Sequence, residues 1–183
     1  KKLMKLANKK NIPLLKINSF RYQDDKGYDF IKSLNPDFIV EHSHYWISKK
    51  IRDLSLKGFV IGSHPGIVPQ YRGSSSCFWA RFKGDNNKNG FSIIFINSEP
   101  DAGPIISQKI IPYNPNYSFI ANDIILLKMI SHELVNVVNK VARGHTLELK
   151  IQKPLLKSQI YQGPGLIMYL LFYLKELLRK LNF

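Results

Sequence analysis

The chain has 183 residues and a mass of 21.1 kDa, which suits one compact domain rather than two large lobes. Hydrophobic residues make up 44% and charged residues 22%, values that exclude a disordered, collagen-like or coiled-coil chain. The net charge of +14 is the outlier, because it predicts a positive surface potential that attracts anions. We therefore expect a partner that carries phosphate.

The cysteine and apolar content predict a cytoplasmic protein. A single cysteine, Cys77, cannot form an internal disulfide, which fits a reducing compartment. The longest apolar run, residues 166–174, is nine residues long, whereas a membrane span needs about 20. The sequence predicts neither a membrane span nor a signal peptide.

The first third of the chain alternates helical patterns with short apolar runs. Helices are predicted at residues 1–10, 28–34 and 48–56, and strands at residues 12–17, 37–41 and 59–62. Continuous apolar strands that alternate with helices are typical of a parallel sheet covered on both faces.

The remaining elements follow a loop rich in proline and glycine at residues 64–73. A helix with serine hydroxyl caps is predicted at 74–82, strands at 89–96 and 105–111, and helices at 119–141 and 166–181. In an open α/β sheet such a loop lies at the edge where ligands bind.

Two strand ends carry groups suited to acid–base chemistry. His64 follows the strand at 59–62, and Asp101 lies in the turn after the strand at 89–96. A carboxylate beside an imidazole would orient the ring and favour its charged form. The structural alternatives are a histidine that satisfies a turn and an aspartate that forms one.

Three sequence blocks resemble the folate-dependent formyltransferase family. They are His-Pro-Gly at 64–66, Pro-x-Tyr-Arg-Gly at 69–73 and Asp-Ala-Gly-Pro-Ile-Ile at 101–106. The likeness runs in order from about residue 35 to about residue 111 and more loosely to residue 141. The family includes glycinamide ribonucleotide, methionyl-tRNA and sugar N-formyltransferases, and the chain resembles the sugar enzymes most.

The resemblance implies a Rossmann-like α/β formyltransferase fold, with a mostly parallel central sheet, helices on both faces and an appended C-terminal helix. The implied domains are a catalytic domain at residues 1–150, whose first strand is missing, and a C-terminal extension with an amphipathic helix at residues 151–183. We therefore expect an N-terminally truncated chain.

The implied activity is transfer of a formyl group from the co-substrate 10-formyltetrahydrofolate to a primary amine, namely an amino sugar on a nucleotide. Glycinamide ribonucleotide formyltransferase and formyltetrahydrofolate hydrolase are alternatives of the same fold, and a non-catalytic folate- or anion-binding relative is an alternative of another class. The family needs no metal.

The resemblance also assigns residues to roles. His64 and Asp101 match the catalytic histidine and aspartate. The pterin is expected at Tyr45, Trp46, Ile47, Ser98, Glu99 and Pro100, and the amine substrate at Tyr71, Arg72 and Gly73.

One position departs from the family pattern. The family places a catalytic asparagine two residues before the histidine, where this chain has Gly62. Loss of an oxyanion donor costs on the order of a hundredfold to a thousandfold in turnover. Ser63, Asn97 or a backbone amide could act as the substitute donor, and Ser63 is the third catalytic candidate. Gly62→Asn is expected to raise turnover.

Other signals have simpler interpretations. His42 and His44 could lie on one face of a strand, but no third histidine follows at ligand spacing, so we expect no metal. Cys77 lies in a predicted helix start and is expected to pack in the interior.

The apolar run at residues 166–174 precedes basic residues, which leaves three alternatives open: a helix that packs on its own domain, a second copy of the chain in a homodimer, or a membrane surface that the C-terminal helix contacts peripherally. The sequence has no aromatic-rich nucleic-acid motif, so nucleic acid is not an expected partner.

Overall fold

The computed structural model describes residues 2–17, 25–42, 46–153 and 159–181. In chain order its elements are α1 (Lys2–Lys9), α2 (Asp25–Ser33), β1 (Ile39–Glu41), α3 (Lys49–Arg52), β2 (Val60–His64), β3 (Tyr71–Gly73), α4 (Ser76–Phe82), η1 (Asn86–Lys88), β4 (Gly90–Phe95), β5 (Ile105–Ile110), α5 (Phe119–Ala142), β6 (Gln159–Tyr161) and α6 (Leu166–Leu181). They divide into two compact units, Lys1–Ile39 with Tyr45–Phe59, and Val40–His44 with Val60–Phe183.

Local contacts hold the smaller unit, which contains α1, α2 and α3. The Ser55 hydroxyl bonds to the carbonyl oxygens of Asp37 at 3.2 Å and Phe59 at 2.8 Å. The rings of Phe38 and Phe59 stack with centroids 6.0 Å apart. The strand predicted at residues 12–17 is wrong, because those residues form no strand. An apolar run becomes a strand only where a neighbouring strand supplies backbone partners.

The larger unit contains a four-stranded sheet in the order β1-β2-β4-β5. The sheet is not mostly parallel, since β4 runs antiparallel to both β2 and β5. The predicted mostly parallel sheet is therefore wrong. Only residues 96–104 join β4 to β5, and a parallel pair needs a crossover of a dozen or more residues, usually a helix.

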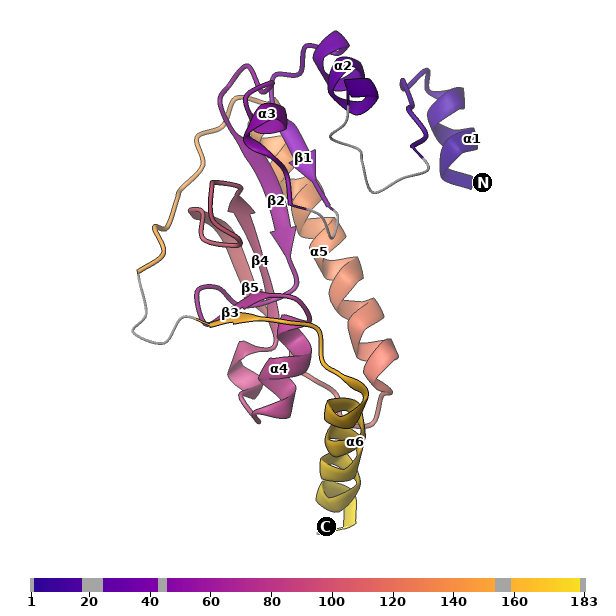
Figure 1. The fold of residues 1–183 in the computed structure, drawn as a ribbon, viewed down its shortest axis with the longest axis vertical. Coiled ribbons are helices and arrows are strands. Elements are labelled where there is room, and N and C mark those ends of the chain that lie inside the picture. Colours follow the sequence, from indigo (N-terminus) through magenta and orange to yellow (C-terminus); the bar gives the residue numbers. More distant parts are fainter. Residues whose placement is uncertain (1, 18–24, 43–45, 154–158, 182–183) are drawn as a thin grey trace. The chain divides into compact units, whose positions relative to one another are not determined.

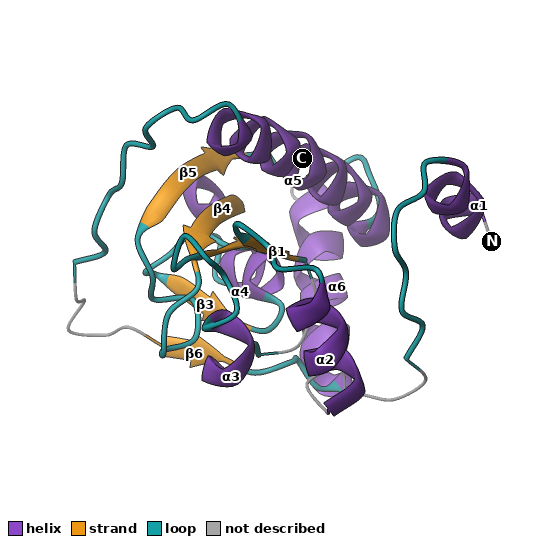
Figure 2. Ribbon diagram, turned by 90° about the horizontal axis from the view of Figure 1, so that it is seen from above, coloured by secondary structure: helices purple, strands orange, loops and turns teal. Residues whose placement is uncertain are grey.

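Helix α5 covers one face of this sheet and lies along β4 and β5 (Figures 1 and 2). The Ser118 hydroxyl caps the helix by accepting the Ala121 backbone N–H at 3.1 Å. The buried face of α5 consists of Asn122, Leu126, Ile130, Val137 and Val141. The predicted helix at residues 119–141 is thus confirmed within one residue of its C-terminal end.

The short strands β3 and β6 were not predicted and form a second sheet. They pair in parallel, with Tyr71 opposite Gln159 and Gly73 opposite Tyr161. The Ser74 backbone N–H extends the pairing to the Tyr161 carbonyl oxygen at 2.8 Å. This sheet brings the C-terminal part of the chain beside the Tyr-Arg-Gly segment.

Helix α6, whose predicted bounds of 166–181 are confirmed, is anchored by one buried aromatic side chain. Phe172 is 2% exposed, and its ring centroid lies 5.4 Å from that of Phe78 and 5.6 Å from that of Phe119. Leu166, Ile167 and other apolar residues of this helix are exposed. None of the helices in the described part of the chain has the length and apolar content to cross a membrane.

We expect Phe172→Ala to lower the free energy of unfolding by about 3–5 kcal/mol, because it empties the space between α4 and α5. Leu170→Ala is the control, since Leu170 lies on the same helix and is 61% exposed, so its effect should stay within about 0.5 kcal/mol. Urea unfolding measures both variants. Equal losses would show that Phe172 does not anchor α6.

Candidate active site

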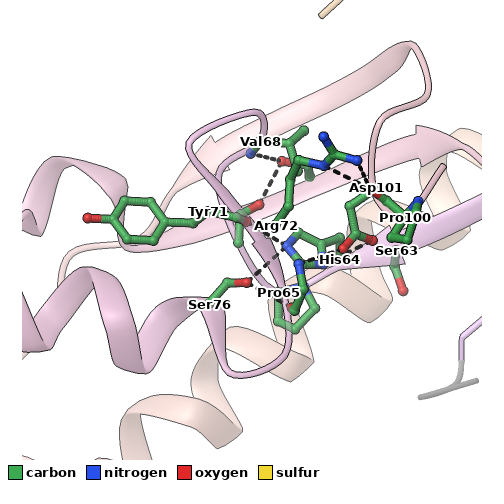
Figure 3. A network of polar contacts seen from close by, with 12 residues as sticks. Ser63, His64, Pro65, Val68, Tyr71, Arg72, Ser76, Pro100 and Asp101 are labelled. Carbon is green, nitrogen blue, oxygen red and sulfur yellow. Dashed lines mark hydrogen bonds and ion pairs between the residues drawn. The ribbon is translucent and has the colours of Figure 1, made fainter. Parts of the chain in front are cut away.

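His64 lies at the end of β2 with its imidazole ring between two acceptors (Figure 3). Its Nδ1 is 3.3 Å from Oδ1 of Asp101, and its Nε2 is 2.8 Å from the Tyr71 carbonyl oxygen. The Ser76 hydroxyl lies 3.2 Å from the same Nε2. In its protonated form the ring therefore donates to a carboxylate on one side and to a carbonyl on the other.

Asp101 is the more accessible member of this pair. Its side chain is 22% exposed, whereas that of His64 is 6% exposed. Its second oxygen, Oδ2, accepts the Gly73 backbone N–H at 2.8 Å. A small molecule that approaches from solvent thus reaches the carboxylate before the imidazole, and the carboxylate is the group placed to accept a proton.

The loop after His64 is tied to the sheet through Ser92. The Ser92 hydroxyl donates to the Gly66 carbonyl oxygen at 2.7 Å and accepts the Val68 N–H at 3.3 Å. A Cβ on Gly66 would lie 2.6 Å from His64 Nε2, so this position must remain glycine. The close approach of this loop keeps the imidazole buried.

The three residues predicted to border the amine have different surroundings. Arg72 Nε donates to the Pro100 carbonyl oxygen at 2.8 Å, and its Nη2 is 3.7 Å from Glu99. Gly73 contacts Asp101 through its backbone N–H. The Tyr71 hydroxyl instead donates to Asp85 at 3.2 Å.

Tyr71 therefore contributes its backbone to the site. Burial, followed by the Asp85 carboxylate, raises the pKa of its hydroxyl above the usual range. Its ring stacks on Tyr161 with centroids 5.4 Å apart. Its carbonyl oxygen lies 2.8 Å from His64 Nε2.

Gly62 leaves space that another side chain fills. A Cβ built on Gly62 would lie 2.2 Å from Cδ1 of Ile96 and 3.5 Å from Oε2 of Glu41. Gly62 and His64 point to the same face of β2, because residues two apart on a strand share a face. Ile96 therefore occupies the position from which an asparagine at residue 62 would reach the reacting group.

Ser63 lies between these two residues on β2, so its side chain points to the opposite face. Its hydroxyl is 2.5 Å from Nδ1 of His42. Its predicted role as a substitute oxyanion donor stays a prediction, and the structure pairs the hydroxyl with His42 rather than with His64.

The residues predicted to hold the pterin are divided between the two units. Ile47 is buried and Trp46 is 41% exposed in the smaller unit, where the Arg52 guanidinium lies 5.5 Å from the Trp46 ring. Ser98, Glu99 and Pro100 precede Asp101 in the larger unit. Tyr45 lies outside the described residues, as does His44. The pterin site stays a prediction.

Cys77 packs as an interior residue. Its sulfur lies 3.2 Å from each of the carbonyl oxygens of Pro65 and Gly90, either of which can accept the S–H, and burial raises the pKa of the thiol to about 11. Within the described ranges, no three His, Cys, Asp or Glu side chains are grouped to hold a metal ion.

Sequence reasoning missed Ser76, Ser92 and Gln152, which hold the imidazole, the loop and the Asp101 turn respectively. Ser92 is a lone hydroxyl residue on an otherwise apolar strand. Because a buried hydroxyl needs a hydrogen-bond partner, this pattern was a signal in the sequence. Ser76 and Gln152 reach the site only through long-range contacts, for which a single sequence gives no signal.

We expect Cys77 to react with iodoacetamide at pH 8 at least about a hundredfold more slowly in the folded chain than in urea. The raised pKa leaves only about one thiol in a thousand ionised at that pH, and burial blocks the reagent. Mass spectrometry follows the alkylation. Similar rates in both states would contradict the buried, neutral thiol.

We expect Gly62→Asn alone to lower the free energy of unfolding by about 1–3 kcal/mol, because Ile96 must move. Because Ile96 fills the space, we expect Gly62→Asn to raise turnover only when Ile96→Ala is made in the same chain. Urea unfolding of the two single variants and of the double variant tests the contact. We expect the double variant to lose less free energy of unfolding than the sum of the two single losses. Additive losses would show that Ile96 does not block the position.

Comparisons with known proteins give the family of the chain. The sequence model of the family described as Formyl transferase matches residues 3–121. A methionyl-tRNA formyltransferase from Thermotoga maritima is 29% identical over 148 residues, which cover 80% of this chain and 46% of that protein. A phosphoribosylglycinamide formyltransferase from Haemophilus influenzae is 32% identical over 95 residues, which cover 52% of this chain and 44% of that protein. The chain thus spans less than half the length of these relatives.

Solved structures show the same fold. The formyltransferase PseJ from Anoxybacillus kamchatkensis, crystallised with UDP-4,6-dideoxy-4-formamido-L-AltNAc and tetrahydrofolate, superimposes with a TM-score of 0.62 at 19% identity. The match covers 88% of this chain and 80% of that one. Since the family match covers more than half of its residues, the chain belongs to the formyl transferase family.

Proposed function

We propose that this chain transfers a formyl group from 10-formyltetrahydrofolate to a primary amine, and that the amine belongs to a sugar carried on a nucleotide. The observation that carries the proposal is the contact between the buried His64 and the accessible Asp101 at 3.3 Å. Family membership supports the reaction class.

The reaction forms a bond between the amine nitrogen and the formyl carbon and breaks the bond from that carbon to N10 of the folate. Asp101 accepts the proton that the attacking amine loses, directly or through a water molecule, and returns it to N10 as tetrahydrofolate leaves. His64 lies behind the carboxylate, where an Nδ1–H donated to Oδ1 orients it. One proton thus moves from the amine to N10, and no other reactant is required.

Charge develops on the formyl oxygen as the amine attacks. Gly62 offers no side-chain donor to that oxygen, and His64 Nε2 faces the Tyr71 carbonyl oxygen. The protein therefore offers that oxygen no hydrogen bond from a side chain at residue 62, and the His64 ring acts through its contact with Asp101. The absent bond favours a slow transferase, or the non-catalytic relative that binds folate or anions without turnover.

Two observations and one chemical argument support a nucleotide-linked amino sugar. The net charge of +14 suits a substrate that carries phosphate. The solved relative PseJ was crystallised with a UDP-linked formamido sugar, and the match covers most of both chains. A sugar also carries hydroxyl groups beside its amine, and such a hydroxyl can donate to the developing oxyanion where residue 62 does not. Glycinamide ribonucleotide and methionyl-tRNA remain the alternatives that the other relatives suggest.

We expect His64→Ala and Asp101→Ala each to lower the rate of formyl transfer at least about a hundredfold while the chain stays folded. His132→Ala is the matched control, because His132 is an exposed histidine on α5, and its rate should stay unchanged. Formation of tetrahydrofolate measures the rate. Rates equal to the wild-type rate in both the His64 and the Asp101 variant would exclude the proposed chemistry.

The acceptor is assigned with the wild-type chain and a panel of amines: UDP- and dTDP-linked amino sugars, glycinamide ribonucleotide and methionyl-tRNA. Transfer to a nucleotide sugar supports the proposal, and transfer to another amine alone replaces the acceptor. Release of formate without any amine indicates the hydrolase. Binding of a stable 10-formyltetrahydrofolate analogue without turnover indicates the non-catalytic relative.

A further inference from the structure

The Asp101 turn is held by side chains from distant parts of the sequence. Gln152 donates from Nε2 to the Asp101 carbonyl oxygen at 2.9 Å and to the Gly103 carbonyl oxygen at 2.7 Å. Arg72 donates to the carbonyl oxygen of Pro100 in the same turn. Because both partners of Gln152 are acceptors, the nitrogen of its amide must face them, and both of its N–H groups are used.

The backbone of Asp101 requires such support. Its φ is 52°, in the left-handed region that is unfavourable for a residue with a side chain. Glycine would relieve that cost and remove the carboxylate. Two residues later, a Cβ on Gly103 would lie 1.7 Å from the Phe95 carbonyl oxygen, so the turn is pressed against the end of β4. The main motion left to the turn is therefore rotation of the peptide groups of Asp101 and Gly103, whose carbonyl oxygens Gln152 binds.

The position of Gln152 is fixed by the chain before it. Lys150 and Ile105 exchange two backbone hydrogen bonds, at 2.8 and 2.9 Å, at the start of β5. This bridge anchors the segment beside the Asp101 turn, and two residues further along an extended chain the Gln152 side chain reaches the turn. The bridge and the Gln152 amide thus hold the turn together, although Gln152 lies 51 residues from Asp101 in the sequence.

We propose that Gln152 is a positioning residue for Asp101. Its amide fixes the left-handed turn, and the turn holds the carboxylate so that Oδ1 faces His64 and Oδ2 accepts the Gly73 N–H. Without the amide, the carbonyls of residues 101 and 103 lose their partners, the turn relaxes and the carboxylate leaves both contacts. The catalytic meaning of this role rests on the proposed function, whereas the geometry of the turn does not.

The test uses the Gly73 amide resonance in ¹H–¹⁵N NMR spectra, because this N–H reports directly on Asp101 Oδ2. Asp101→Ala defines the resonance without the bond. We expect Gln152→Met, which keeps the side-chain length and removes the donors, to shift the resonance towards that position. Gln162→Met is the matched control, since Gln162 is exposed, and its spectrum should keep the wild-type Gly73 resonance. A wild-type resonance in Gln152→Met would overturn the proposal.

Gln152→Lys covers the case in which Gln152→Met does not fold, because lysine retains N–H donors on a long side chain. We expect a folded chain with the Gly73 resonance near its wild-type position. A shift as large as that of Asp101→Ala would overturn the role of the donated bonds.

Kinetics then separate this inference from the proposed function. We expect Gln152→Met to lower kcat about ten- to a hundredfold with little change in KM for the amine, as for a misplaced catalytic group. If Gln152→Met shifts the Gly73 resonance and the wild-type chain shows no turnover, the positioning role is supported and the transferase is rejected. An active wild-type chain, with kcat and the resonance unchanged by Gln152→Met, would reject the positioning role alone.

Discussion

The candidate site depends on one backbone conformation, the left-handed turn at Asp101. The carboxylate at this position contacts both His64 and the Gly73 N–H, so the residue cannot be exchanged for the glycine that its φ of 52° favours. Hydrogen bonds to the turn carbonyls offset the conformational cost, and the same bonds fix where the carboxylate points. Stability and orientation therefore have a common origin here, and a change that relaxes the turn also moves the proton acceptor.

Residues on both sides of the predicted boundary at residue 150 form this turn and its surroundings. Lys150 and Gln152 lie beside the turn, and Tyr161 on β6 pairs with β3, whose Gly73 binds Asp101. A Cβ on Gly73 would lie 2.4 Å from the Tyr161 carbonyl oxygen, so β6 packs directly on the segment next to the site. The part of the chain after α5 thus contributes to the geometry of the site.

Local patterns predicted what depends on local physics. Helix α6 has the predicted bounds, and the two residues that the motifs indicated, His64 at the end of β2 and Asp101 in the turn after β4, are in contact. The predicted parallel sheet is wrong because the short connection between β4 and β5 allows only an antiparallel pair. The strand predicted at residues 12–17 is wrong because strand formation requires a neighbouring strand as a hydrogen-bond partner. Ile96 beside Gly62 and Gln152 beside Asp101 are long-range contacts between residues of ordinary type, which no periodicity or motif reveals.

The proposed formyl transfer needs a proton acceptor and an oxyanion donor, and this structure supplies a side chain for the first only. The proton acceptor belongs to the turn after β4, where Asp101 keeps its contacts. The oxyanion donor of the family pattern would belong to β2, where Gly62 and Ile96 leave no amide. Because different segments hold the two positions, loss of the donor does not disturb the acid–base pair. The proposed transfer therefore depends on stabilisation of the oxyanion by groups that the substrates bring, such as the hydroxyls of the proposed amino sugar.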